Sequence, residues 1–198
     1  MKRRIRPYLV VFILLISLVC LLAGCANTEN AILENNKTII IPENKTNAHI
    51  YDFDNVINDN IERKLNVIAI DLKRETNTQL IVMSVPSLSG ISIEEYSDVI
   101  FNTLDIDKQY NSILFLLAKT DNKVFIDVGK GLETTLYQSR KDEILEDYFI
   151  PYFKENYSKA TEYTVEVIAN IITEEYGVKI KFNWLKQRKN SIKFAILS

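Results

Sequence analysis

The chain is poor in the residues on which many active sites depend. Its 198 residues include two cysteines, Cys20 and Cys25, and one histidine, His49. So few Cys and His side chains exclude a disulfide framework and a Cys/His zinc site. A serine or cysteine nucleophile that relied on a histidine base would have to use His49. Because His49 lies in a polar stretch, we interpret it as an exposed side chain ahead of the folded domain.

Net charge is also small, at −2 for the whole chain, but it is unevenly distributed. Of the 24 basic residues, four lie in residues 1–24 and six in residues 177–198, and neither segment contains an acidic residue. Residues 25–176 therefore hold the other 14 basic residues and all 26 acidic residues, a net charge of −12. An acidic body of this kind does not suit a nucleic-acid surface, so we expect no nucleic acid partner.

The N-terminus has the pattern of an export signal. Residues 1–7 are basic, and residues 8–24 form an almost unbroken apolar run of 17 residues. This is the order of a signal peptide, but the run also reaches the lower limit for a membrane span, so an uncleaved anchor is the alternative. The end of the run, Leu22-Ala23-Gly24-Cys25, resembles the lipobox of bacterial lipoproteins.

The lipobox resemblance implies that residues 1–24 are removed as a lipoprotein signal peptide. It also implies that diacylglycerol is attached to the thiol of Cys25. Several acyl chains on one anchor hold a protein durably at a membrane, whereas one chain holds it marginally. We therefore expect a protein that is lipid-anchored through Cys25 at the extracytoplasmic face of a bacterial cell membrane.

Three segments follow the signal peptide. Residues 25–48 are rich in Asn, Thr, Glu and Lys, and we predict a flexible tether that starts at the lipidated cysteine. Within it, Ile39-Ile40-Ile41 is a candidate docking strand. Residues 49–177 form the folded domain. Residues 178–198 form a basic C-terminal tail with interleaved aromatic residues, which suits either a membrane-surface segment or a solvated tail.

Apolar periodicity predicts alternating helices and strands in the domain. A capping-box pattern at Asp59–Glu62 starts a helix that ends near Thr76, and another at Ser92–Glu95 starts a second helix. Further helices are expected to begin at Ser139 and Ser158. Two apolar runs are predicted strands, namely residues 79–85 and 112–118, and the alternating segment 123–128 is a third strand that forms a hairpin with the second. This order predicts a three-layer α/β/α fold, with a small mixed β-sheet and helices on both faces.

Two motifs of the domain are unusual in combination. One is a strand followed by a Gly-x-Gly-Leu-Glu turn, Ile126–Glu133, and the other joins the proline–aromatic segment Ile150–Phe153 to Asn156-Tyr157. Together with Tyr51–Phe53, Gln79–Leu88 and Ile93–Tyr96, they resemble the TPM domain of YgcG-like bacterial proteins. The resemblance implies the same three-layer fold. It further implies activities of three kinds, because family members include divalent-cation binders, phosphatases and accessory subunits of membrane complexes.

The resemblance also implies candidate ligands for a cation, although three positions differ from the family. The family usually has Asp-Asn-Gly where this chain has Tyr110-Asn111-Ser112, and Gln138 stands near another position that is usually Asp. Asp52, Glu133 and Asp107 are the remaining candidate ligands for Ca²⁺ or Mg²⁺, which prefer six or more oxygen ligands. The alternative is that the acidic residues before the first helix serve as turn and capping residues.

Two further groups of residues have both a functional and a structural interpretation. Gly129, Lys130 and Gly131 can offer backbone N–H groups and an ammonium to an anion, or they can form a tight turn between a strand and a helix. An aromatic group can be a partner-binding ridge or ordinary helix packing; it consists of Tyr148, Phe149, Tyr152, Phe153 and Tyr157.

These patterns lead to one expected function and one alternative. We expect a membrane-tethered, extracytoplasmic TPM-domain lipoprotein that acts as a non-catalytic binding or accessory module for an envelope protein or complex. The depleted set of carboxylates favours this function, because metal-assisted chemistry needs several anionic oxygens. The alternative is a divalent-cation-dependent phosphatase that uses Asp52, Glu133 and Asp107.

Overall fold

The centre of the molecule is a four-stranded mixed sheet with the strand order β3-β4-β5-β6. The computed structural model describes residues 30–34, 37–41, 49–104, 106 and 111–179, so Cys25, Asp107 and residues 180–198 lie outside the described residues. Strands β3 (Ile50–Asp52), β4 (Gln79–Val85) and β5 (Ser112–Ala118) are parallel, and β6 (Lys123–Val128) pairs antiparallel with β5. The three predicted strands and the predicted hairpin are therefore confirmed.

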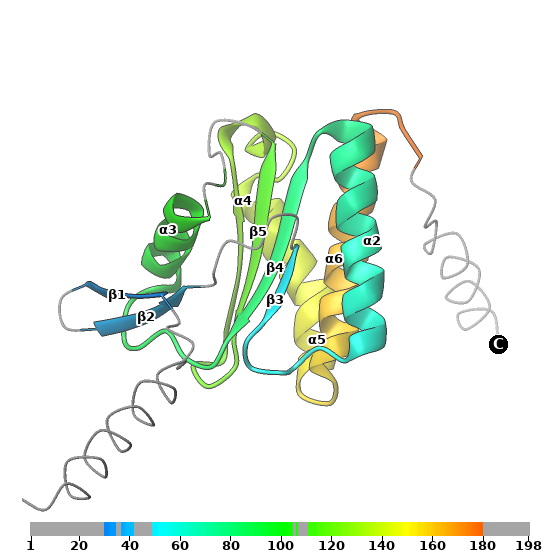
Figure 1. Ribbon diagram of the computed structural model, residues 1–198. Coiled ribbons are helices and arrows are strands. Elements are labelled where there is room, and N and C mark those ends of the chain that lie inside the picture. The colour runs from blue at the N-terminus through cyan, green and yellow to red at the C-terminus, as the bar shows by residue number, and fades with distance from the viewer. Residues whose placement is uncertain (1–29, 35–36, 42–48, 105, 107–110, 180–198) are drawn as a thin grey trace, which may run out of the picture.

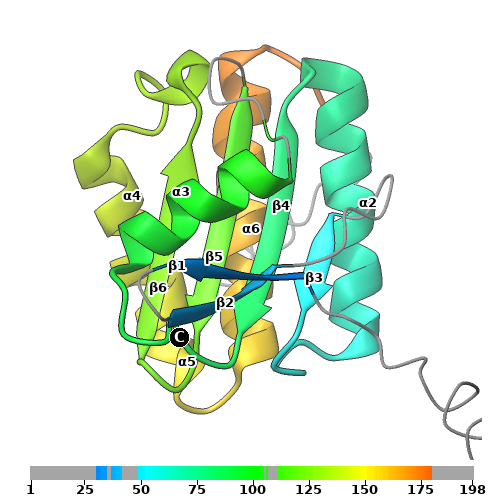
Figure 2. The same ribbon diagram turned by 60° about the vertical axis from the view of Figure 1, so that its left-hand side comes forward.

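Helices cover both faces of this sheet, which confirms the three-layer α/β/α fold. Helix α3 (Ile93–Thr103) lies on one face, and α2 (Asp59–Thr76) and α6 (Tyr157–Glu175) pack against each other on the opposite face (Figures 1 and 2). None of the helices in the described part of the chain is both long and apolar enough to span a bilayer. Four short segments connect β6 to α6: the 3-10 turn η1 (Lys130–Leu132), α4 (Gln138–Ile144), the π-helix η2 (Leu145–Phe149) and α5 (Ile150–Phe153).

The two faces of the sheet bury two separate apolar clusters. Because successive side chains of a strand point to opposite faces, Leu80 and Val82 of β4 pack with α2 and α6, whereas Ile81 and Met83 pack with α3. All seven residues of β5 are buried. Strands that are buried on both faces appear in the sequence as continuous apolar runs, and this is the pattern by which β4 and β5 were predicted.

A two-stranded antiparallel sheet lies beside α3 on the same side of the central sheet. Its strands are β1 (Asn30–Glu34) and β2 (Lys37–Ile41), which cross in front of the central strands in Figure 2. Ile39 of β2 is fully buried in the cluster that contains Met83 and Tyr96. The hairpin falls within the segment 25–48 that we predicted as a flexible tether, and the candidate docking strand at Ile39–Ile41 is part of β2.

Local sequence signals fix several helix ends. The backbone of Asn77 is left-handed, with φ +56°, and it ends α2 directly after Thr76, as predicted. Ser92 caps α3, since its Oγ accepts a hydrogen bond from the N–H of Glu95 at 3.0 Å. At the start of α2 the capping residue is Asn58, one position before the predicted capping box. Asn and Ser serve well at these positions because their short side chains reach backbone groups close by.

Two structural expectations were wrong. Asn156, and not Ser158, caps α6 through its Oδ1, which accepts the N–H of Lys159 at 2.9 Å. His49 is half-buried instead of exposed, because its carbonyl accepts the N–H of Val82 at 2.9 Å and so continues the pairing of β3 with β4. The structured domain therefore includes His49 itself.

Candidate functional site

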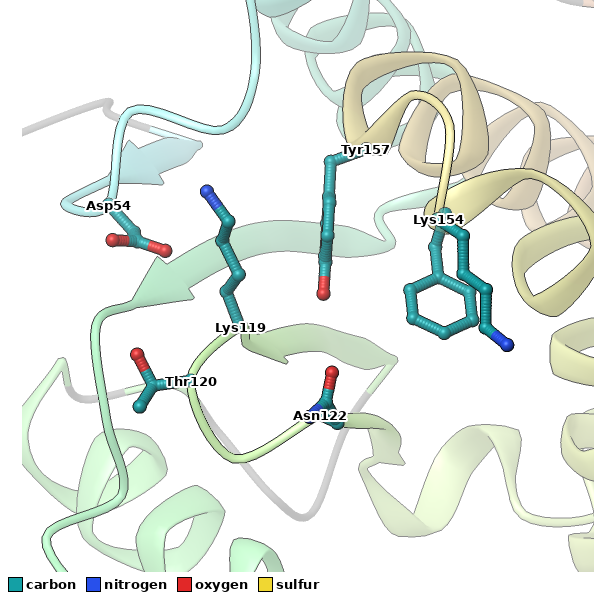
Figure 3. Close-up of a pocket in the computed structure, with 7 residues that line it drawn as sticks. Asp54, Lys119, Thr120, Asn122, Lys154 and Tyr157 are labelled. Carbon is teal, nitrogen blue, oxygen red and sulfur yellow. The ribbon is translucent and has the colours of Figure 1, made fainter.

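The carboxyl ends of the three parallel strands meet at one edge of the sheet, which we call the C-terminal edge. The register aligns Asp52 at the end of β3 with Ser84 of β4, and it aligns Val85 with Ala118 at the end of β5. In α/β sheets, ligands commonly bind outside such an edge. A pocket of about 470 Å³ opens here, and we call it the edge pocket (Figure 3). It is lined by Asp54, Lys119, Thr120, Asn122, Phe153, Lys154 and Tyr157.

Asp52 organises the loop that leads from β3 to α2. Its carboxylate accepts the N–H of Val56 at 3.1 Å and the N–H of Ile57 at 2.7 Å. It also accepts a hydrogen bond from the hydroxyl of Ser84. Both carboxylate oxygens therefore have donors within the protein. This is the turn role that we gave as the alternative to metal binding for the acidic residues before the first helix.

Asp54 lies two residues further along the same loop and contributes one wall of the edge pocket. Its backbone N–H donates to the Oγ of Ser84 at 3.1 Å, which fixes the position of the residue. Its Oδ2 is buried and has no hydrogen-bond partner among the described residues. In Figure 3 the carboxylate faces the side chain of Lys119 across the pocket.

Lys119 rises from the turn between β5 and β6 into the middle of the pocket. The N–H of Asn122 donates to the carbonyl of Lys119 at 3.1 Å, and the left-handed backbone of Asn122, with φ +51°, closes the turn. The Nζ of Lys119 lies 5.9 Å from the ring centre of Tyr157, close enough for a cation–π interaction. Within the described part of the chain, Lys119 forms no salt bridge at 4.0 Å or less.

Tyr157 and Phe153 form the aromatic wall of the pocket. The ring of Phe153 stacks on buried Phe149 with centroids 5.6 Å apart, and it meets Tyr157 edge to face at 5.8 Å. Burial, and secondarily the charge of Asp54, raises the pKa of Tyr157 above its usual value of 10. The Tyr157 hydroxyl therefore stays protonated in neutral solution. Of the aromatic group, Phe149 packs in the core, as the packing alternative expects, and Phe153 and Tyr157 line the pocket, while a partner-binding ridge stays a prediction.

The start of α6 is fixed to the β3–α2 loop by one hydroxyl. Ser158 is buried, and its Oγ accepts the N–H of Asn58 at 2.9 Å and donates to the carbonyl of Val56 at 3.1 Å. These two bonds hold Tyr157 and Asp54 on opposite sides of one cavity, although they are 103 residues apart in the sequence. The pocket is therefore supported by the same contacts that hold the layers of the fold together.

The chemistry of the edge pocket suits hydrogen-bond donation. Two ammonium groups, two hydroxyls and one amide face or border it, against the single carboxylate of Asp54. Among the residues that the structure describes, no three His, Cys, Asp or Glu side chains are grouped so as to hold a metal ion. The arrangement can therefore bind a group that accepts hydrogen bonds and carries negative charge.

The structure does not bring the two described candidate metal ligands together. Asp52 ends β3 at the C-terminal edge, whereas Glu133 follows β6, whose end pairs with the start of β5 at the opposite edge. The register places Asp52 level with Leu117 of β5 and Val128 level with Ile113, four residues earlier, a distance of about 13 Å at a rise of about 3.3 Å per residue. Asp107 lies outside the described residues. A cation site for Ca²⁺ or Mg²⁺ that includes Asp107 stays a prediction.

The candidate anion-binding turn also lies at the opposite edge of the sheet. The N–H of Gly129 donates to the carbonyl of Ser112 at 2.9 Å, and the N–H of Leu132 donates back to the carbonyl of Gly129 at 2.9 Å. Lys130 and Gly131 are exposed on the short turn η1. This geometry is that of the strand-to-helix turn that we gave as the alternative, and anion binding at Gly129, Lys130 and Gly131 stays a prediction.

Sequence reasoning missed most of the edge pocket. Lys119 and Asn122 were identified only as part of a turn, and Lys154 was not singled out. The available signal was positional, because Asp54 and Lys119 each come shortly after a strand that ends at the C-terminal edge. Helix packing supplies Tyr157 from another part of the chain, and no local pattern predicts that approach.

Comparisons with known proteins agree with this fold. The family model described as the TPM domain matches residues 50–171. The chain is similar to the solution structure of the N-terminal domain of a protein from P. gingivalis, with 18% identity and a TM-score of 0.62, over 68% of this chain and 87% of that one. It is also similar to BA42 from Bizionia argentinensis, with 17% identity and a TM-score of 0.53, over 63% and 86% of the two chains.

A third solved structure shows the same likeness. The N-terminal domain of the cg2496 protein from Corynebacterium glutamicum has 15% identity and a TM-score of 0.51, over 72% of this chain and 88% of that one. At these identities the three structures support the fold alone. Comparison with curated proteins finds no significant match.

Proposed function

The chain belongs to the TPM domain family, and from this premise we propose that it acts as a membrane-tethered binding or accessory module for a protein or complex of the bacterial envelope. The tether is the lipid on Cys25 implied by Leu22-Ala23-Gly24-Cys25, which places the domain at the extracytoplasmic face of the cell membrane. We assign the protein no catalytic step, and the surface that binds its partner is the C-terminal edge of the sheet.

One observation carries this proposal, namely the difference between Asp52 and Lys119 at that edge. The carboxylate of Asp52 is already bound by two backbone N–H groups and a hydroxyl. Lys119 places an ammonium in the pocket without a salt bridge to any described residue. An acid whose oxygens are bound within the fold, beside an ammonium that forms no salt bridge with the described residues, favours binding of a ligand over metal-assisted catalysis.

The position of the hairpin supports a domain held close to the membrane. Strand β1 starts at Asn30, five residues after Cys25. Five residues of extended chain reach at most about 18 Å. A lipid on Cys25 would therefore hold the docked hairpin within about two nanometres of the headgroups, in reach of membrane proteins but not of distant soluble ones.

The test of this function is co-purification after chemical crosslinking in a bacterial host. The lipidated chain is expected to enrich a specific envelope protein from the membrane fraction. A Cys25→Ala chain, which lacks the anchor, serves as the control and is expected to lose that enrichment. Equal recovery of proteins by the two chains would contradict the proposal.

The alternative of a divalent-cation-dependent phosphatase is supported by the name of the matching family, TPM_phosphatase. It is tested by incubating the purified protein with an aryl phosphate and Mg²⁺ or Ca²⁺. Turnover that needs the cation and falls at least tenfold in a Glu133→Gln variant would favour this alternative. Turnover that is absent, or that the variant leaves unchanged, would count against it.

A further inference from the structure

We propose that the edge pocket binds a carboxylate, presented by an acidic side chain of the partner protein next to an apolar residue. This inference rests on the proposed function and names the chemistry of the partner. It assigns Lys119 as the residue that recognises the charge, and Phe153 and Tyr157 as the surface for the apolar neighbour.

The first argument comes from the donors that face the cavity. The Lys119 ammonium enters the pocket between Asp54 and Tyr157, and the hydroxyl of Tyr157 points toward Asn122 (Figure 3). The raised pKa of Tyr157 keeps this hydroxyl protonated, so it can donate a hydrogen bond. A carboxylate has two oxygens with about four lone pairs and accepts several donors at once.

The second argument comes from charge. Lys119 and Asp54 carry opposite charges near the middle of the pocket, and Lys154 adds a positive charge at its border, with the ammonium directed away from Lys119 in Figure 3. The lining residues together therefore carry one net positive charge, which the single negative charge of a carboxylate neutralises. A phosphate monoester is close to a dianion near neutral pH and would leave an excess negative charge beside the buried Oδ2 of Asp54. The pocket therefore suits a monoanion better than a dianion.

The third argument is that no described residue forms a salt bridge with Lys119 and so competes with the ligand for its ammonium. Lys119 forms no salt bridge within 4.0 Å to any residue that the structure describes, although Asp54 faces it. An ammonium that is exposed and unpaired is available to an incoming anion without first breaking an ion pair. Its cation–π contact with Tyr157 keeps it over the cavity in the meantime.

The size and lining of the pocket indicate what chemical group accompanies the carboxylate in the ligand. A volume of about 470 Å³ is within the range of small-ligand pockets and exceeds what one carboxylate fills. The rings of Phe153 and Tyr157 meet edge to face and present an apolar wall. An acidic residue followed by an apolar or aromatic residue matches both parts of the pocket.

The experiment is an NMR titration of the ¹⁵N-labelled full-length protein in maltoside micelles. The probe is N-acetyl-Glu-Phe-amide, and the neutral control probe is N-acetyl-Gln-Phe-amide. The expected result is a set of shift changes at residues 119–122 and 153–157, with at least tenfold weaker binding of the neutral probe. Inorganic phosphate at the same concentration is expected to displace the acidic probe less well than acetate does.

A matched pair of lysine variants locates the effect. Lys119→Met keeps the length of an exposed side chain and removes its charge, and it is expected to weaken the acidic probe at least tenfold. Lys73→Met removes an exposed lysine in the last turn of α2, next to the start of β4 and therefore at the opposite edge of the sheet, and is expected to leave binding unchanged. The proposal is overturned if both probes bind equally, if phosphate binds more tightly than acetate, or if Lys119→Met has no effect.

The same variants separate this inference from the proposed function. If the crosslinked partner is retained by Lys119→Met while the acidic probe is not, the envelope function stands and carboxylate recognition as its basis is overturned. If the acidic probe binds but the lipidated chain enriches no partner, the pocket chemistry stands and the envelope function fails.

Discussion

At the scale of single residues, two aspartates in one short loop have different roles. Asp52 accepts three hydrogen bonds from the loop and from Ser84, whereas the Oδ2 of Asp54 is buried without a partner among the described residues. Both residues are aspartates and they are two positions apart, so residue type and sequence position alone do not distinguish their roles. Only the direction of each side chain relative to the backbone N–H groups decides between a structural acid and a pocket acid.

The roles of the two aspartates predict different effects on stability. Asp52→Asn replaces an oxygen acceptor by an amide NH₂ that faces a backbone donor, so it is expected to lower the free energy of unfolding by about 1–3 kcal/mol. Asp54→Asn is expected to change it by less than about 0.5 kcal/mol, or to raise it slightly, because a buried charge is removed. Urea unfolding followed by circular dichroism measures both variants. Equal losses of stability would contradict the assignment.

His49 predicts a dependence of stability on pH. Burial, with a smaller contribution from Lys73, lowers the pKa of its imidazole below 6.5, and its Nδ1 has no partner among the described residues. The unfolded chain then binds a proton more readily than the folded one. The contribution of His49 to stability is therefore complete above pH 6.5 and is lost as pH falls toward the folded-state pKa.

The single histidine makes this prediction easy to measure. Its imidazole signals in a proton NMR titration are unique, and they should report a pKa below 6.5. The urea midpoint should fall more between pH 8 and pH 5 in the natural protein than in His49→Gln. A titration midpoint at or above 6.5 would contradict the buried position of this side chain.

At the scale of elements, short-range sequence signals determine some strands and helix ends, and tertiary contacts determine others. Strands β4, β5 and β6 and the start of α3 were predicted because each has its own local pattern: a buried apolar run in β4 and β5, alternation in β6, and a capping serine before α3. The three-residue strand β3 has no such pattern and exists because it pairs with β4. Ser158 was expected to begin a helix, but its hydroxyl bonds to a loop 100 residues away, a contact that no local rule reveals.

The left-handed end of α2 predicts a sharp difference between two substitutions. Asn77 has φ +56°, a conformation that costs most residues about 1 kcal/mol or more and costs glycine little. Asn77→Ala is expected to lower the free energy of unfolding by about 1 kcal/mol, and Asn77→Gly is expected to leave it nearly unchanged. Thermal unfolding of the two variants provides the comparison, and equal melting temperatures would refute it.

The hairpin β1–β2 predicts that part of the segment before the domain contributes to its stability. Ile39→Ala leaves a cavity at a fully buried position in the apolar cluster between the central sheet and α3. The substitution is expected to lower the free energy of unfolding by about 2–4 kcal/mol. Ile70→Ala is the matched control, because Ile70 is 44% exposed on α2 and its loss should cost about 0.5 kcal/mol or less. If Ile39→Ala lowers the free energy of unfolding no more than Ile70→Ala does, residues 37–41 add nothing to the stability of the domain, as expected of a flexible tether, and the prediction is contradicted.

At the scale of the whole molecule, the sequence predicted the layers but not the place where they form a site. The helices on both faces follow from apolar patterns and from the right-handed connections of parallel strands, whereas β3 at the start of the strand order was not predicted. The edge pocket depends on three loops that meet only after folding, and so Lys119 and Tyr157 were not predicted as a pair. The candidate ligands Asp52 and Glu133 were paired in the sequence analysis, yet the register of β5 and β6 separates them.

The central claim, that the C-terminal edge contacts an envelope partner at the membrane, is tested most directly by site-specific photo-crosslinking in cells. A photoreactive residue replaces Thr120 at the edge pocket in one chain and Lys130 at the opposite edge in another. Both side chains are exposed and neither backbone is left-handed, so each substitution should leave the fold intact. The account predicts one specific crosslinked partner from position 120, none from position 130, and none from position 120 when Cys25 is alanine. Equal crosslinking from the two edges, or no partner from position 120, would contradict it.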